Sequence, residues 1–364
     1  MPRSTRRSLT MTDWRKMISH GGLRLRQGPT PQVGVEIVGN STGTLPVSPP
    51  DPRGNLQGLD FLWLELTGKC NLQCVHCYAG SGPYASPTEL TLEDWVAVLE
   101  EGYALGCRRV QFIGGEPTLY KGLVELIERA RRIGYEFVEV FTNGIHFSEA
   151  VRAVFRKERV HLAFSLYSSD PLVHESITLQ PGSFKRTLSS IRWAVANNLP
   201  TRAAIIAMTR NKSGVEETRH FLADVGVQRV VVDRIRGVGR GSSEAVSTDP
   251  LDELCGDCWN GKLCVTGSGD VYPCIMARFA RVGGINEGLD HLIRTTELVA
   301  FRSQVFGRYA PGPSFRYESE CAPNVPDRIK CAPQAPCGPS ASSVASCAPG
   351  EPAPWRPPPA PPPH

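Results

Sequence analysis

The chain has 364 residues, enough for about two domains or one large domain with a sizeable buried core. Its 40 basic and 36 acidic side chains give a formal net charge of only +4, which provides no argument for a nucleic-acid partner. No uncharged apolar run reaches membrane-spanning length and no apolar segment of secretory length follows the basic start, so the sequence predicts a cytoplasmic protein without a membrane partner.

The predicted elements begin after an irregular N-terminal part. Residues 1–60 are rich in Gly, Pro, Ser and Arg, so we interpret them as an N-terminal extension with one candidate strand at 33–38. From residue 61, short β-branched apolar runs alternate with helical patterns. The predicted strands are 61–66, 109–114, 137–142, 161–166, 202–208 and 229–235. Six strands separated by helices favour right-handed βαβ units, so we expect an α/β fold over residues 61–245, a partial (β/α)6 barrel with a parallel sheet.

The helix after the first predicted strand has the clearest boundaries. Thr91 and Asp94 suit its N-terminal cap, apolar residues follow at helical spacing, and Gly106 ends it. Further helices are predicted near 121–133, 184–197 and 214–225.

After about residue 250 the alternation of predicted strands and helices stops and cysteines become more frequent. Eight of the twelve cysteines lie within 255–347, where apolar residues are too few to build a separate core, so metal ligation is expected to supply folding energy. We therefore expect a small cysteine-rich domain at 246–347. The proline-rich residues 348–364 are predicted to be a disordered tail.

Three thiols follow the first predicted strand within eight positions, at Cys70, Cys74 and Cys77. Twelve cysteines in a chain without a secretory signal favour metal or redox chemistry over disulfides. Three thiolates suit a [4Fe-4S] cluster with one iron left open, just as catalytic zinc keeps one protein position open. A zinc site completed by His76 or by a distant ligand is the alternative, although His76 would point about 100° away from Cys77 around a helix.

Polar segments end the next three predicted strands and lie at the same edge of the sheet as the thiols. They are Ile113-Gly114-Gly115-Glu116-Pro117, Thr142-Asn143-Gly144 and Phe164-Ser165-Leu166-Tyr167. The cysteines have the spacing C-x3-C-x2-C, and the three polar segments follow them in this order along the chain. With these motifs, residues 61–241 resemble the radical S-adenosylmethionine (radical SAM) enzymes. In that family the cysteine motif binds a [4Fe-4S] cluster and a GGEP segment meets the methionine amino group of SAM.

The resemblance implies a role for each matching residue. Cys70, Cys74 and Cys77 would ligate the cluster, and His76 would lie near the adenine. The other SAM contacts would come from Gly114, Gly115 and Glu116 for the amino group and from Ser165, Thr142 and Asn143 for the ribose or carboxylate. Taken singly, a GGEP segment is also a common loop turn and Ser165 a common strand-end hydroxyl.

A second group of cysteines occupies residues 255–274. Its members are Cys255, Cys258, Cys264 and Cys274. A redox C-x-x-C pair and a zinc ribbon are both possible for such spacing. The phrase Gly-Asp-Val-Tyr-Pro-Cys, which ends at Cys274, resembles the SPASM or twitch extension of radical SAM enzymes, and this resemblance implies an auxiliary [4Fe-4S] cluster.

The last four cysteines form an internal repeat, each with proline two residues later. They are Cys321, Cys331, Cys337 and Cys347. They could close a second auxiliary cluster, or they could be idle thiols of a low-complexity tail. Because the usual order of SPASM cysteines differs from the order here, one or two auxiliary clusters remain possible. Cys107 is left over, and we expect it to be a small buried apolar residue.

Three classes of function fit these motifs. The first is an enzyme that abstracts a hydrogen atom from a ribosomally synthesised peptide and forms a crosslink, a thioether or an epimer. The second is tailoring of a small natural product such as an aminoglycoside or a nucleoside sugar. The third is a non-catalytic iron-sulfur scaffold, which would not need an open iron or a GGEP segment. Either enzyme would need an electron donor such as flavodoxin or ferredoxin.

Overall fold

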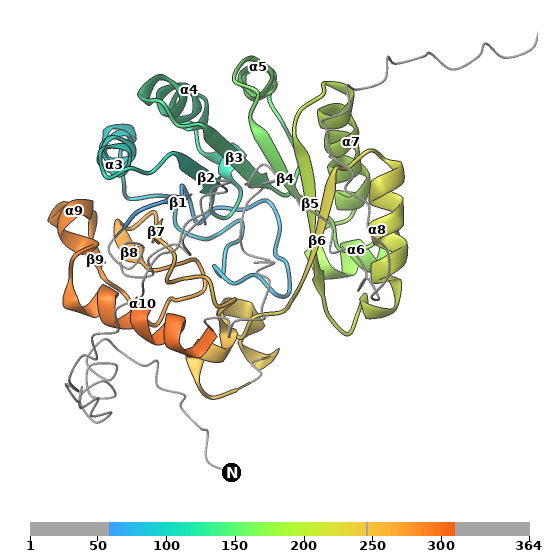
Figure 1. Cartoon of the computed structure of the whole chain (residues 1–364). Coiled ribbons are helices and arrows are strands. Elements are labelled where there is room, and N and C mark those ends of the chain that lie inside the picture. The colour runs from blue at the N-terminus through green and yellow to red at the C-terminus, as the bar shows by residue number, and fades with distance from the viewer. Residues whose placement is uncertain (1–57, 245–246, 310–364) are drawn as a thin grey trace, which may run out of the picture. The chain divides into compact units, whose positions relative to one another are not determined.

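The computed structural model describes residues 58–244 and 247–309 (Figure 1). They form a nine-stranded sheet in the order β6-β5-β4-β3-β2-β1-β7-β8-β9. The candidate strand at 33–38, the proline-rich tail and the repeat of Cys321, Cys331, Cys337 and Cys347 lie outside the described residues.

Strands β1 to β6 are the six predicted strands, and each neighbouring pair in this series is parallel. Their bounds are β1 Phe61–Glu65, β2 Arg109–Ile113, β3 Phe137–Thr142, β4 His161–Ser165, β5 Thr201–Ala207 and β6 Arg229–Arg234. Within the described residues β6 does not pair with β1, so the sheet stays open and the prediction of a partial barrel is confirmed.

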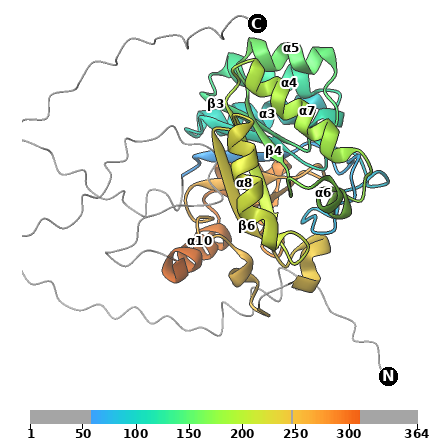
Figure 2. The same cartoon turned by 90° about the vertical axis from the view of Figure 1, so that its right-hand side faces the viewer.

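Helices α3, α4, α5, α7 and α8 lie on the outer side of this curved sheet, and in the turned view α8 lies beside β6 (Figures 1 and 2). The main helices are α3 Leu92–Ala104, α4 Leu123–Ile133, α5 Glu149–Lys157, α6 Pro171–Thr178, α7 Ser183–Ala196, α8 Val215–Asp224 and α10 Thr296–Tyr309. Thr91 and Asp94 form the predicted cap of α3, each side chain accepting a hydrogen bond from the other residue's backbone N–H. None of the described helices combines the length and apolar composition of a membrane span.

The core has two layers because β1 alternates between two faces. Leu62 and Leu64 point into the larger cluster, between the sheet and the outer helices, and Cys107 is buried there as predicted. Phe61 and Trp63 point the other way, into a second cluster with residues from beyond position 250. The inner face of β1 is therefore covered by the C-terminal part of the described chain.

That C-terminal part extends the same sheet. Strand β7 (Lys262–Val265) pairs in parallel with β1 and places Cys264 beside Trp63, while β8 (Asp270–Tyr272) and β9 (Gly283–Gly284) continue antiparallel. Apolar side chains of this region pack on β1; they include Leu251, Leu254, Trp259, Phe301 and Val305. From its composition we expect metal ligation to supply the folding energy of this C-terminal region. The structure shows that burial of its apolar side chains against β1 also stabilises it.

Candidate active site

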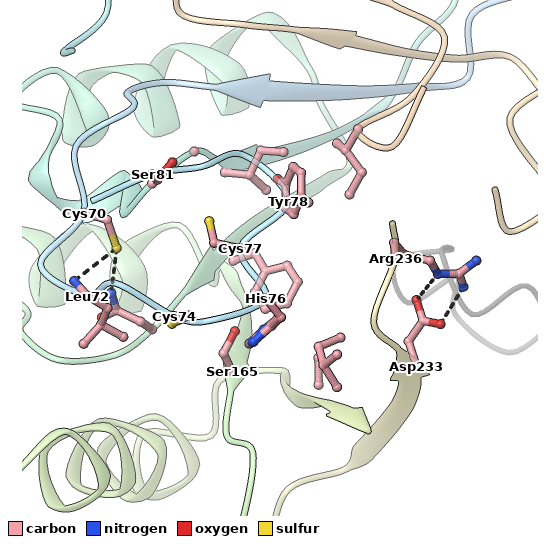
Figure 3. Close-up of a pocket in the computed structure, with 18 of the residues that line it drawn as sticks. Cys70, Leu72, Cys74, His76, Cys77, Tyr78, Ser81, Ser165, Asp233 and Arg236 are labelled. Atoms are coloured by element: carbon pink, nitrogen blue, oxygen red, sulfur yellow. Dashed lines mark hydrogen bonds and ion pairs between the residues drawn. The ribbon is translucent and has the colours of Figure 1, made fainter. Parts of the chain in front are cut away.

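Residues 66–82, here called the cysteine loop, connect β1 to the segment before α3. Cys70 is buried and Cys74 and Cys77 are half-buried; none of the three is in a disulfide. The last turn of α6 holds the loop, because the N–H of Val75 donates to the carbonyl of Ile177 over 3.0 Å. All three cysteines line one cavity of about 220 Å³ (Figure 3). The structure thus brings together the three predicted cluster ligands.

Hydrogen-bond donors surround these sulfurs. The backbone N–H of Leu72 and the side-chain amide of Asn143 both face Cys70 Sγ, at 3.4 and 3.6 Å. The Tyr167 hydroxyl hydrogen-bonds with Cys74. Burial raises the pKa of the Cys70 and Cys74 thiols to about 12, so these thiols need a bound cation to ionise. Soft sulfur ligands that face N–H and O–H donors fit the requirements of an iron-sulfur cluster.

The glycine pair after β2 allows two backbones to touch. Gly114 has a φ of 143°, and a side chain on Gly115 would place its Cβ 2.2 Å from the carbonyl oxygen of Lys69. The N–H of Gly115 donates to Thr67 and that of Glu116 to Lys69, over 2.6 and 2.8 Å. Both glycines line the cavity. Glycine is therefore required here for the end of β2 to support the cysteine loop.

The Glu116 carboxylate connects the end of β2 to the end of β3 through hydrogen bonds. It accepts hydrogen bonds from the backbone and hydroxyl of Thr118, from the Thr142 hydroxyl and from the Asn143 N–H, all within 2.7–3.1 Å. It is 1% exposed and is not among the residues that line the cavity. Burial raises the pKa of this carboxyl, while the hydrogen bonds oppose the shift. Its observed contacts indicate a positioning role, and direct contact with SAM stays a prediction for this residue.

The other predicted SAM contacts lie around the same cavity. Thr142, Asn143, Ser165 and His76 all line it, and Figure 3 shows His76 and Ser165 near the cysteines. The His76 ring packs edge-on against Tyr167 with centroids 4.7 Å apart. Burial lowers the pKa of His76 to about 4, so this ring is neutral near pH 7. A neutral, half-buried ring can pack against an aromatic base.

Arg240 is a site residue that the motifs did not reveal. Its Nε and Nη2 donate to the carbonyls of Cys74 and Ser81, both over 2.8 Å, and its backbone N–H donates to Cys77 over 3.0 Å. Gly239 precedes it with a φ of 60° and passes so near the loop that a Cβ would lie 2.2 Å from the carbonyl of Tyr78. The glycine-rich run at 237–241, directly after β6, was the available signal.

Replacing Arg240 with methionine should weaken iron retention by about 10–100-fold, since groups that orient metal ligands typically contribute this much. Iron remaining on the reconstituted protein after challenge with a chelator measures the effect. Arg186→Met is the matched control, because Arg186 also donates to two carbonyls, those of Pro181 and Gly182, but at the start of α7. Equal iron loss from the two variants would contradict this role for Arg240.

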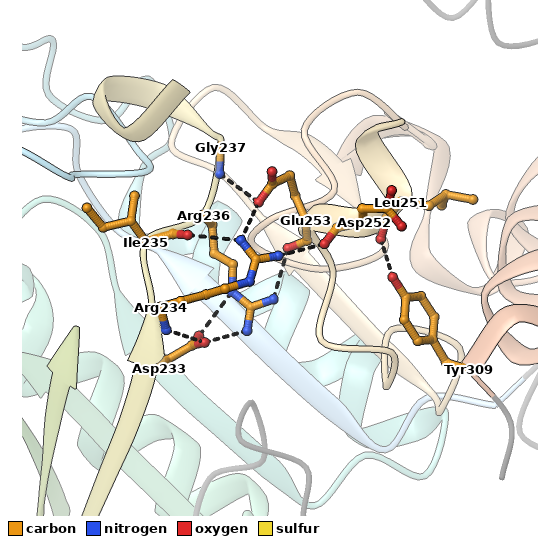
Figure 4. Close-up of polar contacts among 9 residues, drawn as sticks. All are labelled: Asp233, Arg234, Ile235, Arg236, Gly237, Leu251, Asp252, Glu253 and Tyr309. Atoms are coloured by element: carbon orange, nitrogen blue, oxygen red, sulfur yellow. Dashed lines mark hydrogen bonds and ion pairs between the residues drawn. The ribbon is translucent and has the colours of Figure 1, made fainter. Parts of the chain in front are cut away.

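Two charged side chains at the end of β6, Asp233 and Arg236, face the cysteines across the cavity (Figure 3). Arg236 pairs with Asp233 through Nη2 and Nε, over 2.5 and 3.2 Å. Glu253 accepts from Arg234 Nη1 and from the N–H of Gly237, over 2.9 and 2.8 Å (Figure 4). These contacts fix the loop after β6 to the segment that leads into the second group of cysteines.

The second group of cysteines gathers beneath β1. Cys258 Sγ lies 2.8 Å from Cys274 Sγ, and Cys258 also hydrogen-bonds with Cys255. Cys264 is fully buried in the same apolar cluster, where Cys274 contributes to the electrostatic environment of its thiol. Within the described residues, no three His, Cys, Asp or Glu side chains are near enough to hold a single metal ion. All four cysteines of this group belong to or pack against one apolar cluster, and their ligation of an auxiliary iron-sulfur cluster stays a prediction.

His174, on α6, should make stability depend on pH. It is buried, its Nδ1 accepts the N–H of Tyr167 over 3.2 Å, and burial lowers its pKa from 6.5 to about 4. His174 is therefore protonated near pH 6.5 in the unfolded chain but only near pH 4 in the folded protein. Because the unfolded state binds the additional proton, the free energy of unfolding falls as the pH drops from about 6.5 to about 4. In urea unfolding at pH 7 and pH 5, His174→Asn should lose less stability than the wild type. His220→Asn, at an exposed position on α8, should behave like the wild type; equal losses in all three proteins would contradict the assignment.

Comparisons with known proteins agree with this geometry. Residues 64–222 match the family model described as the Radical SAM superfamily. The sporulation killing factor maturation protein SkfB of Bacillus subtilis is 35% identical over 156 residues, which cover 42% of this chain and 36% of SkfB. The match therefore spans about a third of the length of that curated relative.

Two solved structures show the fold. Streptococcus suis SuiB bound to S-adenosylmethionine aligns with a TM-score of 0.58 at 15% identity, covering 68% of each chain. SuiB bound to its precursor peptide SuiA aligns with a TM-score of 0.59 at 13% identity, covering 80% of this chain and 77% of SuiB. Residues 64–222 are thus similar to the radical SAM superfamily, and the two SuiB structures share the fold of this chain.

Proposed function

We propose that this protein is a radical SAM enzyme that modifies a ribosomally synthesised peptide. The observation that carries the proposal is the convergence of three unpaired thiols, a glycine pair and strand-end polar groups on one cavity. A [4Fe-4S] cluster with an open iron would supply the electron that cleaves SAM to the 5'-deoxyadenosyl radical, which abstracts a substrate hydrogen atom.

The protein's own residues hold and orient the reactants. Cys70, Cys74 and Cys77 would bind the cluster, and Arg240 fixes the loop that carries them. Gly114 and Gly115 bring backbone groups to the cavity for the SAM amino group, while Ser165, Thr142 and Asn143 offer polar contacts to its ribose or carboxylate. His76 would pack near the adenine. The walls of the barrel keep water away from the radical.

The second group of cysteines is proposed to bind one auxiliary [4Fe-4S] cluster. Cys255, Cys258, Cys264 and Cys274 supply four sulfurs, which suits a fully ligated cluster. Cys321, Cys331, Cys337 and Cys347 are proposed as ligands of a second one. Reduction would come from flavodoxin or ferredoxin, and the free thiols of the described residues suit the cytoplasm.

A peptide substrate is favoured over a small natural product by two of the relatives. SkfB is a maturation protein of a killing factor, and SuiB has been crystallised with a precursor peptide. The test is anaerobic reconstitution, an iron count, and addition of reductant and SAM with either a candidate precursor peptide or amino-sugar extracts. The proposal predicts 5'-deoxyadenosine and a changed peptide mass. Turnover of the amino sugars alone would overturn the choice of substrate, and iron for only one cluster per chain would overturn the auxiliary clusters.

A further inference from the structure

The floor of the cavity contains three polar side chains, where the interior of a barrel is normally filled by apolar ones. Gln111 on β2 and Glu139 on β3 are register partners, and Arg202 comes from β5. Their exposed fractions are 3%, 0% and 7%. Gln111 and Arg202 line the cavity. Gln111 lies two residues before Ile113 at the end of β2, and Arg202 lies two residues before the register partner of Ser165, so both are about 7 Å deeper in the barrel than these strand ends.

The hydrogen bonds within this triad leave two groups open. Arg202 donates through Nε and Nη2 to the two oxygens of Glu139, each over 2.8 Å, and Gln111 Nε2 also donates to Glu139. Because a carboxylate only accepts, the amide nitrogen of Gln111 must face Glu139, which leaves its Oε1 on the other side. Among the described residues, neither Arg202 Nη1 nor Gln111 Oε1 has a hydrogen-bond partner. The floor thus offers one N–H donor and one carbonyl acceptor to a ligand.

We infer that this floor binds a neutral amide of the substrate, either a backbone peptide group or an Asn or Gln side chain. An amide carbonyl would accept from Arg202 Nη1 and its N–H would donate to Gln111 Oε1. The charge balance selects a neutral group, because Glu139 already neutralises Arg202 and a bound carboxylate would be an unpaired buried charge. Phe141, which lies 5.1 Å from the Arg202 guanidinium, supplies an apolar flank.

This inference rests on the proposed function and sharpens it. Arg202 lies two residues before Ala204, the register partner of Ser165, so the floor is one layer below a predicted SAM contact. A substrate amide held on the floor would place the neighbouring carbon toward the cofactor. Gln111 and Arg202 are thus assigned as substrate-binding residues that choose an amide over a carboxylate.

The test uses two probes on the reconstituted protein with SAM bound: N-acetylalanine methylamide, a neutral diamide, and N-acetylalanine, its carboxylate counterpart. Ligand-observed NMR at pH 7 should detect the diamide and show at least tenfold weaker binding of the carboxylate. Equal or tighter binding of the carboxylate, or no binding of the diamide, would overturn the inference. This comparison needs no variant, so it does not depend on a substituted protein folding.

Variants then locate the site. Gln111→Met and Arg202→Lys should weaken diamide binding by about 3–10-fold, the loss expected for one hydrogen bond. Tyr135→Phe is the control, since it removes a buried hydrogen bond to Leu99 outside the cavity and should bind the diamide normally. Unchanged binding in the first two variants would contradict the assignment. Formation of 5'-deoxyadenosine without substrate, measured separately, shows whether the radical chemistry itself has failed.

Discussion

Replacing Cys74 with alanine should abolish 5'-deoxyadenosine formation completely. Cys74 is one of three thiols at the cavity, and two remaining sulfurs cannot hold a cluster that also keeps an open iron. Iron per chain should fall by the content of one cluster, and chromatography of the anaerobic reaction should show no product above background. The barrel should remain folded, because the cysteine loop lies outside its strands.

Cys107→Ala is the matched control for this loss. Cys107 is also a buried thiol, but it lies in the main apolar cluster and donates to the carbonyl of Arg109 over 3.2 Å. This variant should lose some stability through the small cavity it creates, yet retain its iron and its product. If Cys74→Ala kept forming 5'-deoxyadenosine, or if Cys107→Ala stopped, the role assigned to the cysteine loop would be wrong.

Gly115→Ala should destabilise the protein by about 2–3 kcal/mol and abolish SAM binding. The added Cβ would meet backbone atoms of Lys69 at 2.2 and 2.6 Å, and a backbone cannot move aside as a flexible side chain can. The end of β2 and the cysteine loop must then separate, which breaks the hydrogen bonds of Gly115 to Thr67 and of Glu116 to Lys69. Urea unfolding and equilibrium dialysis with SAM measure the two effects.

Gly307→Ala is the opposite case. Gly307 lies in the last turn of α10, is exposed, and has no heavy atom within 4 Å of an added Cβ. Alanine favours a helix over glycine, so this variant should gain up to about 1 kcal/mol and bind SAM normally. A Gly115→Ala protein as stable as the wild type would contradict the prediction, because it would show that the backbones at Gly115 and Lys69 can separate without loss of stability.

Local patterns were enough to predict the barrel strands. Buried parallel strands read as continuous apolar runs, and all six runs became strands. Helices α5 and α6 were missed, although Ser148 and the pair Asp170-Pro171 carry the capping signals that start them. The pairing of β7 with β1 joins segments about two hundred residues apart, and neither segment contains a signal for its partner.

The same limit applies to the site. The cysteines and the glycine pair stand in motifs whose spacing carries the chemistry, so sequence alone could predict them. Arg240 contacts a carbonyl 166 residues away, and Arg202 meets a carboxylate 63 residues away. An isolated arginine in a strand or loop resembles any surface arginine until the fold supplies its partner. The hydrogen bonds of Glu116 to Thr142 and Asn143 depend on the position of β3, so the GGEP segment alone could not predict them.

The most direct test of the account is deuterium transfer from a peptide. A candidate precursor peptide with fully deuterated residues is incubated anaerobically with the reconstituted protein, SAM and reductant, and the 5'-deoxyadenosine is analysed by mass spectrometry. The account predicts that deuterium from the peptide appears in the product and that the peptide changes mass. Formation of 5'-deoxyadenosine without deuterium, from a peptide that stays unchanged, would contradict it.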